Sequence, residues 1–110
     1  MNDLEALQKQ RTDAEEFIAR RERALRLADN PDFKHLVLNE FCVQECARYA
    51  QSSSDPALKP EQRADALGIA QAAGHFRRWM SVVIQMGNQA ESQLEAIDQA
   101  IDEVRAGSEA

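Results

Sequence analysis

Apolar residues recur every three or four positions along most of the chain, which is the spacing of one face of an α-helix. The clearest series lies in the C-terminal half: Trp79, Val83, Met86, Ala90, Leu94, Ile97, Ile101 and Val104. This heptad-like series predicts a coiled-coil seam with one stutter. A weaker N-terminal series contains two arginines: Leu4, Leu7, Arg11, Ala14, Ile18, Arg21, Leu25 and Ala28.

Capping residues followed by proline divide the chain at three points, namely Asn30-Pro31, Asp55-Pro56 and Lys59-Pro60. Asparagine and aspartate side chains cap helix N-termini, and proline suits the first turn because no N–H is needed there. The pattern predicts helices over about 3–28 and about 32–51, a helical region over about 60–105, and a frayed tail at 106–110. Gly74 allows two interpretations of the helical region over about 60–105: the chain bends at this glycine and forms two helices, or the glycine lets another backbone pack closely.

The simplest arrangement of these predicted helices is an all-α single domain over residues 1–110. We expect the first helix and the C-terminal helix to pair antiparallel as a helical hairpin or coiled-coil stem, joined by a small helical head. Residues 36–43 are apolar on almost all sides, which predicts that this segment is enclosed. The stem buries little apolar area, so we expect self-association or a partner, and pairing within or between chains stays open.

Charge is distributed unevenly in this chain of 110 residues, which has 13 Lys and Arg, 19 Asp and Glu, and a net charge of −6. An acidic total argues against a nucleic-acid coat protein, so nucleic acid is not an expected partner. Antiparallel pairing of the stem would bring six arginines to one end, as a candidate basic docking patch: Arg20, Arg21, Arg23, Arg26, Arg77 and Arg78. Three uses stay open, namely internal ion pairs, contact with the acidic stem of a neighbouring copy, and phosphate binding.

The C-terminal series also yields a candidate interface seam: Phe76, Trp79, Val83, Met86, Leu94, Ile97, Ile101 and Val104. Large apolar residues at helical spacing belong either to the core of one chain or to an interface, where aromatic residues serve as anchors. The seam is therefore interpreted as core that can also bind a copy of the chain or another protein.

The residue types that carry enzyme chemistry are few and scattered, so we predict no catalytic, cofactor-binding or metal-binding site and no enzyme activity. Cys42 and Cys46 lie one helical turn apart, but a metal site needs about two more ligands, and His35 and His75 are the only histidines. The cysteines are interpreted as reduced core residues. No serine, histidine and acid arrangement or glycine-rich phosphate loop is present.

The N-terminal residues have no apolar leader, and the longest apolar stretch, 79–86, is too short to span a membrane. We therefore expect synthesis in the cytoplasm and no membrane partner.

Three stretches together resemble a group of short helical proteins encoded among the head and assembly genes of tailed bacteriophages: residues 30–41, 55–63 and 77–87. The resemblance covers about residues 4–105 and implies a phage structural or virion-assembly protein, present in many copies. Its implied partners are further copies and capsid, portal or scaffold proteins, and its implied location is the bacterial host cytoplasm or the virion. The alternative is a small regulatory or host-takeover protein that binds a bacterial protein or a nucleotide-type ligand through its arginine cluster.

Overall fold

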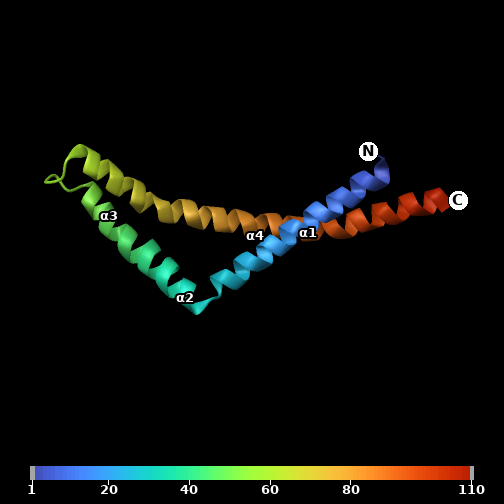
Figure 1. Ribbon diagram of the computed structural model, residues 1–110, viewed down its shortest axis with the longest axis horizontal. Helices are drawn as coiled ribbons and strands as arrows, with labels where there is room; N and C mark the ends of the chain where they lie inside the picture. Colours follow the sequence, from blue (N-terminus) through green and yellow to red (C-terminus); the bar gives the residue numbers. More distant parts are fainter. Residues whose placement is uncertain (1, 110) are drawn as a thin grey trace. The chain divides into compact units, whose positions relative to one another are not determined.

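The computed structural model describes residues 2–109, and helices make up nearly all of this range (Figure 1). No strand occurs among the described residues, which confirms the predicted all-α class. In chain order the elements are α1 (Asp3–Ala28), α2 (Pro31–Phe33), the π-helix η1 (Lys34–Glu45), α3 (Cys46–Ser53) and α4 (Pro60–Glu109). The helix α4 includes Gly74 and also most of the segment 106–110 that was expected to fray.

The helix boundaries follow the capping residues that the sequence offers. The Asn30 side chain accepts a hydrogen bond from the Phe33 amide at 3.0 Å, and Pro31 occupies the first turn behind it. The Asp55 carboxylate accepts a bond from the Ala57 amide at 2.9 Å, but the segment 54–59 forms only a turn. A new helix therefore begins at Pro60, the later of the two prolines.

Residues 34–45 form a π-helix, whereas the sequence predicted an ordinary α-helix for this part of the chain. The Cys46 amide donates to the carbonyl of Phe41, five residues earlier, as π-helical bonding requires. Because π-helical bonding widens the turn, Leu36 and Phe41, which are five residues apart, lie closer in direction here than in an α-helix, where they would be about 140° apart. Most π-helices in proteins are single turns, often at functional sites, so this 12-residue segment is unusual.

The chain divides into two compact units. The first, which we call the terminal unit, contains residues 2–25 and 82–109; the second, the central unit, contains residues 26–81. In the terminal unit α1 and the C-terminal part of α4 run antiparallel, since Arg11 pairs with Asp98 and Arg21 with Glu91 (Figure 1). This confirms the predicted hairpin of the first and last helices.

Small residues form the core of the terminal unit. Its buried hydrophobic residues are Ala14, Ala24, Val83, Ala90 and Ile101. Alanine permits close approach of two helices, but it contributes little buried area. The N-terminal seam passes through Ala24 and not through the predicted Leu25, which is 43% exposed.

The central unit is a second antiparallel hairpin, in which α2, η1 and α3 face the first part of α4 across the turn at 54–59. The rings of Phe33 and Phe76 lie 6.1 Å apart at one end, and the Cys46 thiol donates to the Ile69 carbonyl at 3.6 Å. The buried hydrophobic residues of this unit are Cys46 and Ala66. The prediction that residues 36–43 are enclosed is wrong, because no residue of η1 is buried.

Candidate interaction surfaces

The predicted interface seam is buried to very different degrees along its length. In the terminal unit Val83 and Ile101 are 3% and 5% exposed, and the other four seam residues there are half-buried: Met86, Leu94, Ile97 and Val104. Met86 and Ile97 line a groove together with Ala14 and Phe17 of α1, so this part of the seam contacts α1 of the same chain. In the central unit Phe76 is half-buried and packs at 6.4 Å from the ring of Trp79, which is 53% exposed.

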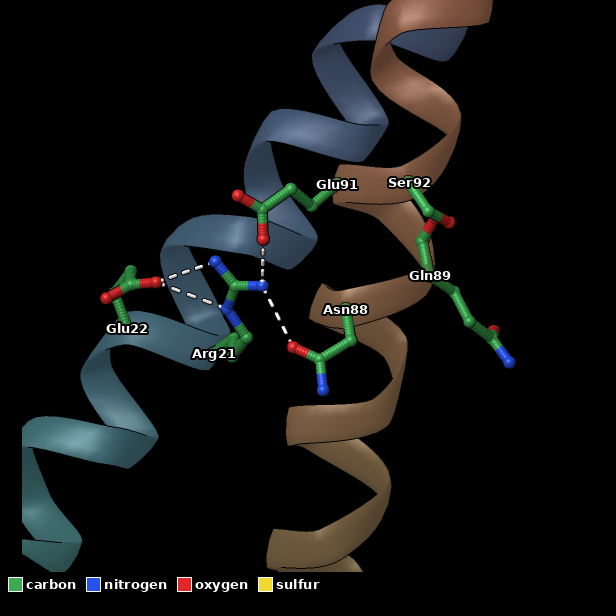
Figure 2. A network of polar contacts seen from close by, with 6 residues as sticks. All are labelled: Arg21, Glu22, Asn88, Gln89, Glu91 and Ser92. Atoms are coloured by element: carbon green, nitrogen blue, oxygen red, sulfur yellow. Dashed lines mark hydrogen bonds and ion pairs between the residues drawn. The ribbon is translucent and has the colours of Figure 1, made fainter.

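Arg21 is the one charged residue of the described chain that is buried in the helix pairing, at 8% exposure. Figure 2 shows its guanidinium group between α1 and α4, with acceptors on both helices. Its Nη1 atom donates to the Glu91 carboxylate at 2.6 Å and to the Asn88 side-chain oxygen at 2.9 Å. Its Nε and Nη2 atoms donate to the Glu22 carboxylate at 3.1 and 2.8 Å.

These bonds favour the charged guanidinium form. The hydrogen bond that Arg21 donates to Glu91, followed by those that it donates to Glu22, raises the pKa of Arg21 above its usual range. Gln89 and Ser92 are close in sequence but point away from the guanidinium group (Figure 2). Three acceptors in a fixed arrangement match the planar fork of arginine, so the cluster fixes the alignment of α1 on α4.

Gly87 makes this arrangement possible because it leaves room for Arg21. A Cβ atom at position 87 would lie closer than 3.0 Å to three side-chain carbons of Arg21, among them Cβ. Gly87 is therefore a point of close approach between the two helices. Sequence reasoning identified Arg21 as an interruption of the seam but missed Gly87, Asn88 and Glu91 as its counterparts. The sequence did contain a signal for this arrangement: Gly87 follows the seam residue Met86, and Glu91 comes four residues later on the same helix face.

The six arginines of the predicted basic patch belong to both units. Arg20, Arg21 and Arg23 lie in the terminal unit, and Arg26, Arg77 and Arg78 lie in the central unit. Arg21 is committed to internal bonds, and Arg77 donates to the Leu38 carbonyl at 3.4 Å. Internal pairing, which was one of the three uses left open, therefore accounts for Arg21. A docking role for the remaining arginines stays a prediction.

The central unit exposes an unusual number of large apolar side chains for its small core. Leu36, Val43 and Leu67 are 56%, 51% and 46% exposed, and Ile69 and Phe41 are 38% and 36% exposed. Phe41 and Ile69 line a groove of about 650 Å³ between η1 and α4. Leu36, Phe41 and Val43 all belong to the π-helix η1, and the sequence prediction that this segment is enclosed did not anticipate their exposure.

Groups that could carry catalysis or hold a metal are dispersed. Among residues 2–109 no three His, Cys, Asp or Glu side chains are grouped so that they could hold a metal ion. Cys42 and Cys46 are both free thiols, half-buried and buried respectively, and His35 and His75 are exposed.

Within the described part of the chain, no helix combines the length and apolar character that crossing a membrane requires. Comparison with known proteins gives no relative: no family model, curated protein or solved structure matches this chain.

Proposed function

We propose that this protein is a non-enzymatic assembly protein that works by binding further copies of itself and other structural proteins through exposed helical surfaces. The observation that carries the proposal is that the central unit buries few apolar side chains and exposes many. Its buried hydrophobic residues are only Cys46 and Ala66, while Leu36, Val43 and Trp79 are more than half exposed. An excess of exposed large apolar side chains over buried ones in one small unit supports an interaction site there.

The core of the central unit is small for its length. A unit of 56 residues is marginally stable even with a full hydrophobic core, because small domains bury a low fraction of their surface. A partner that covers the exposed side chains would supply the missing burial. Association and stable folding of this unit are therefore coupled in the proposal.

The resemblance of residues 30–41, 55–63 and 77–87 to proteins of phage head and assembly genes supports a specific setting. In that setting the protein is made in the cytoplasm of a bacterial host and acts on capsid, portal or scaffold proteins, either as part of the virion or as an assembly factor. Many copies of one chain in a particle would be held together by contacts that repeat with the symmetry of that particle.

Absolute mass in solution tests the proposal. We expect light scattering of the purified full-length protein to show a defined oligomer whose population rises with protein concentration. A monomer at every concentration would refute the self-association on which the proposal depends.

A further inference from the structure

The central unit contains the two thiols of the chain, and they lie one helical turn apart. Cys42 belongs to η1, Cys46 is the first residue of α3, and both are free. Residues four apart on a helix share one face. Side chains of a helix also lean towards its N-terminus, so the Cys46 side chain leans towards the turn that carries Cys42. The fold therefore holds a pair of thiols on one helix face.

The two thiols differ in exposure and in what they contact. Cys46 is 5% exposed, and Cys46 and Ala66 are the buried hydrophobic residues of the central unit. The Cys46 thiol donates to the Ile69 carbonyl at 3.6 Å, which ties the start of α3 to α4. Cys42 is half-buried, so a small reagent in solution reaches its sulfur more easily than that of Cys46.

The backbone between the two cysteines is the place where one helix type gives way to another. The π-helix η1 ends at Glu45, and the Cys46 amide donates to the carbonyls of Phe41 and Val43, five and three residues earlier. An α-helix makes this bond to the residue four positions earlier. A change of bonding pattern inside a helix often marks a hinge or a functional site.

A disulfide between the two sulfurs requires a small tightening of this turn. Cα atoms four residues apart on a helix lie about 6 Å from one another, within the roughly 4.4–6.8 Å found in disulfides. Cβ atoms at this spacing lie about 5–6 Å apart and must approach to about 3.5–4.5 Å. Strain of this kind makes a disulfide easy to reduce, which suits a reversible bond in a reducing compartment.

We propose that Cys42 and Cys46 form a redox-sensitive pair that hydrogen peroxide converts into an intrachain disulfide, which releases α3 from α4. The Cys42 sulfur attacks the O–O bond of the peroxide, becomes a sulfenic acid and releases one water. The Cys46 sulfur then attacks the sulfenic sulfur and displaces hydroxide, which takes up the Cys46 proton and leaves as a second water. The two thiols together lose two electrons and two protons, and one peroxide is reduced to two waters.

Oxidation removes a contact that joins α3 to α4. The disulfide form of Cys46 has no S–H group to donate to the Ile69 carbonyl, and the bond to Cys42 draws its sulfur along its own helix. Because Cys46 is one of two buried hydrophobic residues in the central unit, the change affects much of a small core. We expect α3 to open from α4 more often. This switch goes beyond the proposed function, since it acts within one chain whether or not the chain self-associates.

The first test identifies the bond. Full-length protein is treated with an equal amount of hydrogen peroxide, and the remaining thiols are blocked with iodoacetamide under denaturing conditions. A protease that cleaves after glutamate separates the cysteines, because Glu40, Glu45 and Glu61 enclose the fragments 41–45 and 46–61. We expect the two fragments to stay joined until a reductant separates them. The undigested oxidised chain should migrate as a single chain without reductant, which distinguishes this bond from one between copies.

Single-thiol variants separate the roles of the two sulfurs. Cys46→Ser keeps a donor for the Ile69 carbonyl but has no second thiol, so Cys42 should accumulate as a sulfenic acid that dimedone labels. Cys42→Ser keeps only the buried thiol, which should stay unmodified at the same peroxide dose. A wild-type chain that does not react, that accumulates sulfinic acid at Cys42, or that forms disulfides only between copies would overturn the proposal.

The second test measures the release of α3. Amide hydrogen exchange is compared between the reduced and oxidised wild-type protein, with residues 46–53 as the readout and α1 of the terminal unit as the internal reference. We expect exchange in α3 to become faster by about tenfold or more on oxidation, while α1 keeps its rates. Peroxide-treated Cys42→Ser is the matched control and should exchange like the reduced protein. Unchanged exchange of α3 in the disulfide form would overturn the switch.

Discussion

Replacement of Gly87 by alanine tests a close contact between α1 and α4. The new methyl group would lie closer than 3.0 Å to Cβ of Arg21, where carbon atoms normally keep about 3.5–4.0 Å. The Cβ atom of Arg21 is fixed to the backbone of α1, so a change of rotamer cannot relieve the clash. The two helices must separate locally instead, and the packing of neighbouring core residues such as Ala24 and Ala90 must loosen.

The magnitude follows from two opposing contributions. Alanine gains about 1 kcal/mol of helix propensity over glycine. Overpacking costs roughly 1–3 kcal/mol, and the upper end applies here because the clash involves an atom attached to the backbone. The free energy of unfolding should therefore fall by about 2 kcal/mol, which corresponds to a decrease in Tm of roughly 8 °C for a chain of this size.

Gly74→Ala is the matched control, because its Cβ meets no atom within 4 Å. It gains the propensity without the clash, so its Tm should rise by about 4 °C. Thermal unfolding followed by circular dichroism, at equal protein concentrations, measures both variants. An equal rise in Tm for Gly87→Ala and Gly74→Ala would refute the close approach of Arg21 to Gly87.

Three further predictions concern the two units. Asn88→Ala removes one acceptor of Arg21, so it should lower the free energy of unfolding, measured with urea, by about 1 kcal/mol. The control Gln89→Ala should change this free energy little, because the Gln89 side chain points away from the guanidinium group (Figure 2). Val83→Ala removes two methyl groups from a residue that is 3% exposed, so it should lower the free energy of unfolding by about 2 kcal/mol. Val43 is 51% exposed, so Val43→Ala should lower it by less than about 0.5 kcal/mol in the same urea measurement. Self-association through the exposed apolar side chains of the central unit should persist in high salt, because salt screens charges but does not weaken apolar contacts. Dissociation of the oligomer in high salt, seen by light scattering, would instead favour contact between arginines and an acidic stem.

The sequence by itself determined the helical class and the pairing of the first and last helices. Apolar residues at intervals of three and four define the faces that must be buried, and Asn30 with Pro31 marks a helix start that the structure uses. These signals are local, since they depend on side-chain spacing and on the hydrogen bonds of a few neighbouring residues. The seam residues Val83 and Ile101 were predicted by the same periodicity and are buried.

Only the tertiary structure decided which residues meet between the helices. In the sequence Arg21 interrupts the apolar seam, whereas in the structure Gly87, Asn88 and Glu91 lie opposite it. The sequence does not show this pairing, because the meeting of positions about 70 residues apart depends on how the two helices align. The π-helix at Lys34–Glu45 was likewise not predicted, since its apolar residues fit an α-helix equally well. Leu36 and Phe41 of this helix are 56% and 36% exposed, so apolar side chains that the sequence predicted to be enclosed are available to a partner.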